Sequence, residues 1–482
     1  MPSIKRNYIY NVLLNLSRVI FPLITAPYIA HVLEPDGVGL FNFSNTYAGW
    51  FAMFALLGIP TYGIRETAKR HNDKEALSRL FSELFTISLT ATLIVTAIYV
   101  PTLFFAGRLH DNYRIFLLSG ILLYMAPFRT DWFFQGMEQF GYITLRTLII
   151  RTISIICIFL FVRTKADLAI YVLLNAAGNV VGDLWNFSRL LRAGIKPKLT
   201  LSGLKKHLGP LFTLFASAIA ISVYTVLDTI MLGFITDYSE VGFYSNAMHI
   251  SKSLLTVVTS LSAVAIPRIS QYYAERDYEK INQLANKSFS VVSSLAVPVA
   301  FGILCIAPTF VPLFFGQAFA GTILPLQILG FLVMAIGLNN LLGMQILIPL
   351  DMDRDFLHSI LAGTVSNFLL NLILIPRFGA TGASAASVTA EILLVAVMAC
   401  KIYRRTPVRI SSGLPDMLRA LAGVILFFPI LHLLSQFLHG WALVAAFTLC
   451  GGCAYIVSQL LLGNSSARTV LDMIMKKIGL NV

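Results

Sequence analysis

Polar side chains recur along one face of the first apolar segment of the chain. In the stretch RNYIYNVLLNLSRVIFPLITAPYIA, from Arg6 to Ala30, these polar residues are Asn7, Asn11, Asn15, Arg18 and Thr25. On a helix they lie within an arc of about 80°. A guanidinium near the middle of a membrane span costs about 2.5 kcal/mol or more, so we expect the stripe to face a protein interior or a wet cavity. The asparagines could equally well satisfy one another and neighbouring helices.

Basic residues also recur inside other apolar segments. We expect Arg129 and Asp131 to pair with each other. The remaining bases of this kind are Arg18, Arg146, Arg151 and Lys252. A cationic surface fits an anionic ligand, and arginine in particular binds phosphate oxygens through two parallel hydrogen bonds. The polar residues that we place along the same cavity are Asn42, Asn45, Asn179 and Asn246.

Three carboxyl groups lie in similar segments, namely those of Asp183, Asp228 and Glu391. An ionisable group inside a membrane is a candidate for binding a coupling proton or sodium ion. A structural hydrogen-bond network would explain Asp228 equally well. The sequence thus predicts coupling to a gradient of H⁺ or Na⁺ without choosing between the two ions.

The composition indicates the kind of protein that holds these groups. Of 482 residues, 57% are hydrophobic and 12% are charged, whereas soluble proteins have about 25% charged residues. The apolar residues are spread over the whole length, which predicts an all-α polytopic membrane protein. The formal net charge is +13. Most Lys and Arg lie in short segments between apolar runs, which is typical of membrane topology and argues against nucleic-acid binding.

We predict about fourteen transmembrane helices, with a bend at Pro22 and Pro27 in the first. About 26 basic residues fall on one side of these spans and about five on the other, which places both termini in the cytoplasm. The loops on the outer side are short. The predicted spans are 8–32, 38–62, 82–105, 113–134, 142–162, 168–189, 209–234, 241–266, 288–314, 322–348, 356–376, 382–403, 416–437 and 441–462.

The sequence also repeats itself weakly. DGVGLFNFSN (Asp36–Asn45) is similar to SEVGFYSNAM (Ser239–Met248). In the first copy Arg65 follows Gly39 after 26 residues, and in the second Arg268 follows Gly242 after 26 residues. We therefore predict two six-helix lobes of equal orientation, related by a pseudo-two-fold axis, that can rock to give alternating access. The predicted domains are 1–206, 207–405, and 406–482 with two extra helices.

Several chemical motifs are absent from the sequence. There is no phosphate-binding G-x-x-x-x-G-K-[ST] loop, no H-E-x-x-H and no G-x-S-x-G, so no ATP-driven motor or hydrolase site is visible. Cys450 and Cys453 form CGGC without a second Cys or His pair, which favours close helix packing over a metal site. We expect no enzymatic activity, no metal and no cofactor. The energy would come from an ion gradient or from the gradient of the substrate.

The first 70 residues resemble the N-terminal signature of the Wzx-type polysaccharide flippases. These belong to the multidrug/oligosaccharidyl-lipid/polysaccharide exporter superfamily. The resemblance rests on RNYIYN, on the spacing of Pro22, Pro27 and Tyr28, on VLEPDGVG and on YGIRETAK. Further along, FGATGASAAS (Phe378–Ser387) is similar to the small-residue turn before helix 12 of that superfamily.

The resemblance implies a MATE-like fold and a substrate. The substrate would be an oligosaccharide repeat unit on undecaprenyl pyrophosphate, flipped from the cytoplasmic to the outer leaflet of the bacterial inner membrane for O-antigen, capsule or exopolysaccharide assembly. Arg18, Arg151 and Lys252 fit the cationic lumen expected in this family. Membrane lipid, a polysaccharide polymerase and a chain-length regulator are the implied partners.

Three alternatives stay open. A lipid II flippase shares the fold and the lipid carrier, but RNYIYN and the single arginine of the first helix favour the Wzx type. A drug exporter of the same superfamily would require an acidic cavity for lipophilic cations. A membrane polysaccharide polymerase or ligase would require a large outer loop with catalytic residues.

Overall fold

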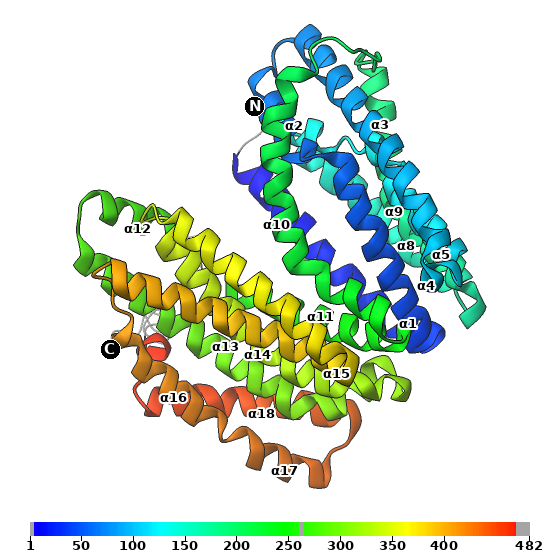
Figure 1. Ribbon diagram of the computed structural model, residues 1–482. Coiled ribbons are helices and arrows are strands. Elements are labelled where there is room, and N and C mark those ends of the chain that lie inside the picture. The colour runs from blue at the N-terminus through cyan, green and yellow to red at the C-terminus, as the bar shows by residue number, and fades with distance from the viewer. Residues whose placement is uncertain (1–3, 260–264, 469–482) are drawn as a thin grey trace. The chain divides into compact units, whose positions relative to one another are not determined.

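The chain folds into helices that group into two compact units. The computed structural model describes residues 4–259 and 265–468, in which all regular elements are helical. The units comprise Met1–Gly242 and Phe243–Val482, and Figure 1 shows their helices. The fold class predicted from the sequence, an all-α polytopic membrane protein, is confirmed.

The first unit holds the helices before residue 243. Its last element, α11, starts in this unit and continues into the second. The elements are α1 (Ile4–Leu56), α2 (Ile59–Lys69), α3 (Lys74–Phe105), α4 (Gly107–His110), α5 (Tyr113–Ser119), α6 (Ile121–Tyr124), η1 (Ala126–Phe128), α7 (Asp131–Gly136), α8 (Phe140–Phe161), η2 (Lys165–Asp167), α9 (Leu168–Arg192), α10 (Lys205–Ile235) and α11 (Tyr238–Thr259).

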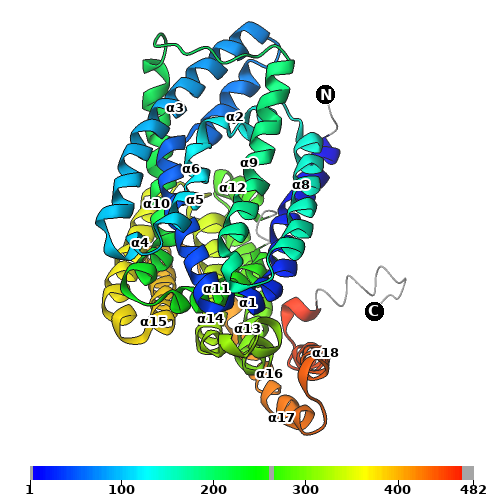
Figure 2. The same cartoon turned by 90° about the vertical axis from the view of Figure 1, so that its right-hand side faces the viewer.

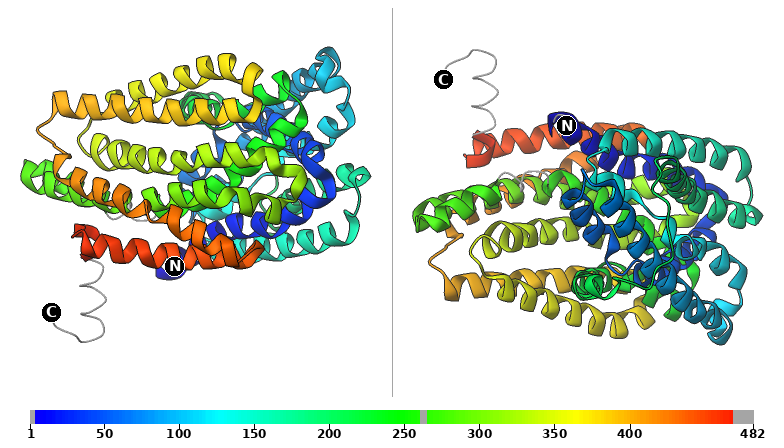
Figure 3. Two further views of the ribbon diagram at one scale, coloured as in Figure 1. Left: turned by 90° about the horizontal axis from the view of Figure 1, so that it is seen from below. Right: turned by 90° about the horizontal axis from the view of Figure 1, so that it is seen from above.

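The second unit is dominated by three long helices, α13, α14 and α15, that lie side by side in Figures 1 and 3. Leucine, isoleucine and methionine side chains from α13, α15 and the π-helical turn η5 form a shared core. The elements are α12 (Ala265–Ala274), α13 (Tyr278–Phe315), η4 (Gln317–Thr322), α14 (Ile323–Asn340), η5 (Leu341–Leu347), α15 (Asp353–Arg405), η6 (Ser411–Gly413), α16 (Leu414–Val424), α17 (Phe427–Phe437) and α18 (Gly440–Leu461).

The helices have the length and composition that a membrane requires. Among residues 4–259 and 265–468, nine helical stretches are long and apolar enough to cross a bilayer. Two of the helices, α1 and α15, have 53 residues each, which is far more than the ~20 that one crossing needs. The two predicted spans 356–376 and 382–403 lie within α15, whereas α1 covers the span 8–32 and most of the span 38–62.

Backbone breaks divide these two long helices at the predicted gaps. Glu34, with φ 56° and ψ 178°, interrupts α1, and Gly379, with φ 53°, interrupts α15. At Pro22 and Pro27, where we expected the first helix to bend, the backbone stays helical. The bend at these two prolines stays a prediction. A break in the helical backbone falls before Pro35, because the proline ring crowds the preceding residue and disfavours the helical conformation there.

The predicted span 113–134 is not a single helix. It is divided into α5, α6, η1 and the start of α7. Pro127 lies within η1, and proline cannot donate the backbone hydrogen bond that a continuing helix needs. The short pieces are nevertheless packed, since Phe116 and Leu123 are fully buried.

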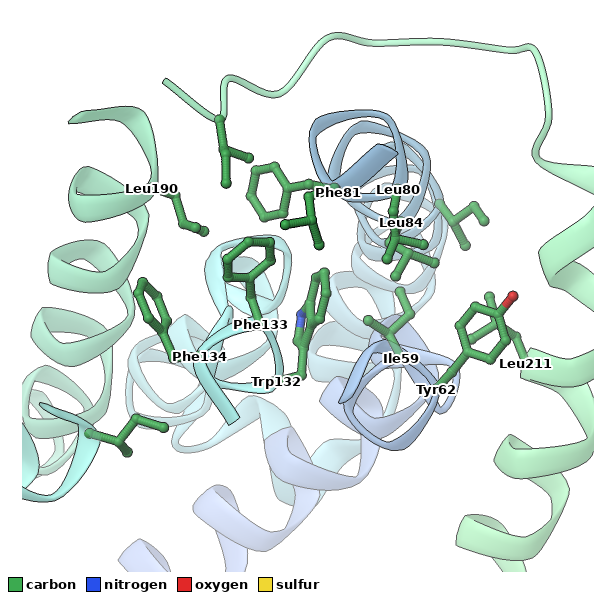
Figure 4. Close-up of a cluster of buried hydrophobic side chains, with 14 of the residues drawn as sticks. Ile59, Tyr62, Leu80, Phe81, Leu84, Trp132, Phe133, Phe134, Leu190 and Leu211 are labelled. Atoms are coloured by element: carbon green, nitrogen blue, oxygen red, sulfur yellow. The ribbon is translucent and has the colours of Figure 1, made fainter. Parts of the chain in front are cut away.

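The first unit is held by an aromatic cluster at one end. Phe81 of α3 packs against Trp132 and Phe133 of α7, with ring centroids 6.1 and 6.2 Å apart. Figure 4 shows these rings beside Ile59 and Tyr62 of α2. Each large aromatic side chain buried in this way removes much apolar surface from solvent. The cluster therefore fixes α2, α3 and α7 against one another.

Two glycines lie against each other where α1 and α11 meet. A Cβ atom on Gly39 would overlap the carbonyl oxygen of Tyr238 and lie 2.9 Å from the nitrogen of Gly242. Conversely, a Cβ on Gly242 would lie 2.5 Å from the carbonyl oxygen of Pro35 and 3.3 Å from the nitrogen of Gly39. The two glycines occupy equivalent positions of the sequence repeat. Reciprocal contact between equivalent residues is what a two-fold relation between the two segments produces.

The domain boundaries predicted from the repeat remain a prediction. The repeat divides the chain before α10, whereas packing divides it after α10, at Gly242. The repeat reflects similarity between two parts of the sequence, whereas the units reflect which helices contact one another. By its contacts α10 belongs to the first unit, because it packs on α1 and α2.

The glycine contact leads to a stability prediction. Gly39→Ala should destabilise the protein by about 2 kcal/mol or more, because the added methyl group meets backbone atoms that cannot rotate away. The matched control is Gly49→Ala in the same helix, where a Cβ would have no neighbouring atom within 4 Å. Thermal unfolding of the purified variants measures the difference. Equal melting temperatures for the two variants would show that the close contact is absent.

Candidate functional site

The first half of α1 pairs with α8 along its length. Thr144 Oγ1 donates to the carbonyl oxygen of Tyr10 at 3.1 Å, and Tyr28 Oη donates to that of Val162 at 2.7 Å. Both contacts join residues 134 positions apart. A constant offset means that the two helices run in the same direction and in a fixed register. Figure 2 shows them side by side.

The same register brings Arg151 to Ser17, a residue of α1 that is not part of the polar stripe. Its Nη1 donates to Ser17 Oγ at 3.4 Å, again across 134 positions. Ser17 is buried, and its hydroxyl donates to the carbonyl oxygen of Leu14 at 2.7 Å. The side chain of Arg18 lies outside those that the structure describes. Arg151 thus reaches the residue next to Arg18 in the sequence, as expected if both belong to one site.

The amides of the stripe are partly open to the surroundings. Asn7 is half-buried, and Asn11 and Asn15 are exposed. Asn15 Nδ2 donates to Asn11 Oδ1 at 3.2 Å. This amide contact agrees with the interpretation that the asparagines help to satisfy one another. Exposed amides in a membrane helix require water or a ligand around them, because lipid chains offer no hydrogen bonds.

A network of charges joins α7, α8 and α9. Arg146 Nη2 lies 3.0 Å from Asp131 Oδ1, and Arg129 Nε lies 3.8 Å from Asp183 Oδ2. Asn186 Nδ2 donates to Asp131 Oδ1 at 2.6 Å. The expected pairing of Arg129 with Asp131 is therefore wrong. Asp131 pairs with Arg146 of α8, and Arg129 pairs with Asp183 of α9.

Arg146 is integrated into this network. It is 6% exposed, and its Nη1 donates to the carbonyl oxygen of Gly182 at 3.0 Å. Its Nε is buried without a hydrogen-bond partner. A buried guanidinium with a nearby carboxylate and carbonyl holds helices together. A role of Arg146 in ligand binding, and of Asp183 in ion coupling, stays a prediction.

The remaining predicted residues of the first unit lie on three helices. Asn42 and Asn45, on the second half of α1, are half-buried. Asn179 of α9 is exposed, and its Nδ2 donates to the carbonyl oxygen of Asn175 at 3.3 Å. Asp228 of α10 is buried. Of the predicted residues of the first unit, Arg146 and Asp183 belong to one charge network, through Asp131 and Arg129.

In the second unit the predicted residues lie on α11 and α15. Asn246 is buried and Lys252 is exposed. Glu391 is 2% exposed, and its Oε2 accepts a hydrogen bond from Asn339 Nδ2 at 3.1 Å. The known partner of this buried carboxyl is thus a neutral amide of α14. Within residues 4–259 and 265–468, no three His, Cys, Asp or Glu side chains form a metal-binding group.

The sequence matches known families over much of its length. Residues 4–273 match the family described as polysaccharide biosynthesis protein. The chain belongs to this family. Residues 214–347 also match the family described as MatE.

Curated relatives of this polysaccharide biosynthesis protein carry transporter names. A protein of Escherichia coli (strain K12), named as an O-antigen transporter, is 26% identical over 404 residues, covering 82% of this chain and 96% of the relative. A protein of Haloferax volcanii, named as a low-salt glycan biosynthesis flippase, is 23% identical over 343 residues, covering 70% and 71%.

Solved structures show the same fold. The lipid II flippase MurJ in an inward closed conformation superposes with a TM-score of 0.68 at 14% identity, covering 98% of this chain and 99% of that one. An inward-facing multidrug resistance MATE transporter gives 0.59 at 15% identity, covering 86% and 98%. The MATE-like architecture expected from the sequence is therefore confirmed.

One buried group of polar residues, formed by Glu83, Lys206 and His207, was not predicted from the sequence. Glu83 of α3 is buried and contacts Lys206 and His207 of α10, with Nζ–Oε1 and Nε2–Oε2 distances of 2.8 Å each. Glu83 lies 123 positions before Lys206 and 124 before His207. A signal was present in Glu83, a lone carboxyl in an otherwise apolar helical segment.

The contribution of the charge network of α7, α8 and α9 to the stability of the protein can be tested by substitution. Arg146→Met should destabilise the protein by about 3 kcal/mol, because it leaves Asp131 without its cation. The double variant Arg146→Met/Asp131→Leu should regain part of this loss. Arg192→Met, which changes an exposed arginine at the end of α9, is the control. Additive losses in the double variant would contradict the ion pair.

Proposed function

We propose that this protein flips a lipid-linked oligosaccharide from one leaflet of a membrane to the other. The observation that carries the proposal is the family match over residues 4–273. Relatives named as an O-antigen transporter and as a glycan biosynthesis flippase support it. The nine apolar helical stretches of the described residues are consistent with a multi-pass membrane protein.

The substrate that fits the site is an oligosaccharide repeat unit on undecaprenyl pyrophosphate. A pyrophosphate is a compact anion with many acceptor oxygens, and a guanidinium binds two of them at once. Arg151 lies in the stretch where α8 meets α1, next to the position of Arg18. The exposed amides of Asn11 and Asn15 could donate to sugar hydroxyls or phosphate oxygens along the same helix.

Orientation and mechanism follow from the same proposal. Both termini lie in the cytoplasm of a bacterium, and the repeat unit moves from the cytoplasmic to the outer leaflet of the inner membrane. Two lobes related by the sequence repeat would rock to expose the substrate alternately to each side. A polysaccharide polymerase and a chain-length regulator would act on the flipped product.

Lipid II flipping is the second candidate. Its support is the superposition on MurJ, which establishes the fold alone at 14% identity. The curated relatives and the RNYIYN opening favour an oligosaccharide repeat unit. Drug export fits less well, because Arg151, the charged residue of α8 that contacts α1, is basic.

Ion coupling would involve a buried carboxyl group whose negative charge is neutralised when it binds a proton or a cation. Asp183 has a cationic neighbour in Arg129, which favours its charged, structural role. Glu391 is buried beside the neutral amide of Asn339, so binding H⁺ or Na⁺ would remove the cost of burying its charge. We therefore place coupling at Glu391 first and keep Asp228 as the alternative.

A complementation experiment tests the function and the role of Arg151 together. Deletion of the gene should cause lipid-linked repeat units to accumulate on the cytoplasmic side and surface polysaccharide to disappear. Wild type should restore flipping, whereas Arg151→Ala should reduce it by about tenfold or more. Arg151→Lys should be intermediate, since it keeps the charge but loses the two-pronged bond.

The matched control for Arg151→Ala is Arg163→Ala, just beyond the end of α8, where the arginine is exposed. Expression levels are compared by immunoblotting. Normal polysaccharide in the deletion strain, together with increased dye sensitivity, would instead support a drug exporter. Full flipping by Arg151→Ala would exclude this residue from the binding site.

Coupling is tested in liposomes with an imposed gradient of H⁺ or of Na⁺. Glu391→Gln should flip at a rate that no longer responds to the gradient, because the amide cannot take up the ion. Asp183→Asn should keep its response and instead lose thermal stability. If Glu391→Gln responds normally and Asp228→Asn does not, coupling belongs to α10.

A further inference from the structure

A chain of three buried side chains ties the start of α10 to α2 and α3. Tyr62 Oη lies 2.7 Å from His207 Nδ1, and His207 Nε2 lies 2.8 Å from Glu83 Oε2. Tyr62 is 5%, His207 1% and Glu83 4% exposed. Figure 4 shows the hydroxyl of Tyr62 directed toward α10, the helix of Leu211. Both ring nitrogens of the histidine are thus engaged, each by a different helix.

This arrangement accommodates the histidine in either protonation state. In the neutral ring, Nε2–H donates to Glu83 while Nδ1 accepts the hydrogen of Tyr62. When a proton binds to Nδ1, the tyrosine hydroxyl rotates and accepts instead, because a hydroxyl can serve as donor or acceptor. One proton is taken up, both contacts persist and no other bond is broken. A partner that could only donate would have fixed the neutral form.

The surroundings allow the extra charge to be held inside the protein. The Glu83 carboxylate faces His207 directly and also binds Lys206, whose amine is largely exposed. Gly203, before α10, packs against Glu83 and Lys206, since a Cβ there would meet their side chains. A buried cation is tolerated when a carboxylate accepts its hydrogen bond.

Other charges near the site belong to α2. The guanidinium carbon of Arg65 lies 5.3 Å from the ring centre of Tyr62. Glu66 binds Lys69 at 2.8 Å and Arg70 at 2.6 Å, and Arg65 at 3.4 Å. These bases oppose a positive charge on His207, while Glu83 and Glu66 favour it. From α7 the neighbours in this cluster are apolar rings such as Trp132.

We propose that His207, held between Tyr62 and Glu83, is a buried proton-binding site that controls how firmly α10 is attached to α3. Protonation turns the hydrogen bond that the Glu83 carboxylate accepts from a neutral ring into an ion pair in which both partners are charged, and this strengthens the contact. His207 lies in the first turn of α10, the helix that also carries Asp228. The link to substrate movement rests on the proposed function, whereas proton binding itself does not.

Histidine NMR tests proton binding on the full-length protein in lipid nanodiscs. With isotope-labelled histidine, the signal missing in His207→Gln identifies His207. Lowering the pH from about 8 to about 5 should change this signal from that of a neutral imidazole to that of a protonated one. In Glu83→Gln the midpoint should fall by about one unit or more, a tenfold loss of proton affinity. An unchanged signal across this range, or an unchanged midpoint in Glu83→Gln, would overturn the proposal.

Hydrogen exchange measures the attachment of α10. After correction for intrinsic rates, the amides of the first turns of α10 should exchange several-fold more slowly at pH 5.5 than at pH 8 in the wild type. Gln at position 207 can still donate to Glu83 but cannot take a proton, so His207→Gln should show no such difference. His432→Gln, at an exposed position of α17, is the control and should behave as wild type. Identical pH dependence of exchange in His207→Gln and wild type would contradict the proposal that protonation of His207 controls the attachment of α10.

Flipping assays separate this inference from the proposed function. In liposomes loaded with a pyrophosphate-linked oligosaccharide, the pH dependence of wild-type flipping should be flattened in His207→Gln. If both flip with the same pH dependence, the link to transport is wrong. If the wild type flips nothing, the proposed function fails while the NMR and exchange results still decide the proton site. Tyr62→Phe, which removes one oxygen, provides a second variant should His207→Gln fail to fold.

Discussion

Lipid chains offer no hydrogen bonds, so every polar group within the helices of this protein must find a partner in another helix, in water or in a ligand. The first unit shows how this constraint organises a bundle. Arg146 reaches from α8 to Asp131 of α7, Arg129 reaches Asp183 of α9, and Glu83 of α3 receives Lys206 and His207 of α10. The ion pairs therefore specify which helices are neighbours as well as adding stability.

Other polar groups, along α1 and α8, carry the function that we propose. Along α1, Asn11 and Asn15 are exposed although they lie in an apolar helix, and Arg151 of α8 meets the same stretch at Ser17. The parallel register of α1 and α8 gives these residues a common position. An anionic, sugar-bearing substrate offers many acceptor oxygens to guanidinium and amide donors.

A flippase must combine rigid helices with places where the chain can change shape. The rigid parts here are the aromatic cluster of α2, α3 and α7 and the three long helices of the second unit. The helix breaks at Glu34 and Gly379 and the glycine contact of α1 with α11 lie at the turns between spans. Close backbone contact between Gly39 and Gly242 requires the absence of side chains at both positions. The repeat in the sequence thus has a packing counterpart at equivalent residues.

The sequence by itself determined the fold class, because hydrophobic composition and the spacing of apolar runs directly reflect the thickness of a bilayer. It also placed Asn7, Asn11, Asn15, Arg18 and Thr25 on one face of the first helix, since the periodicity of a helix is a local property. It could not reveal that Arg129 and Asp131, two residues apart, pair with different helices, or that Tyr62, Glu83 and His207 meet. Such contacts depend on which helices pack together and in what register. That choice is made by long-range packing between segments more than a hundred residues apart, and it is therefore visible only in the tertiary structure.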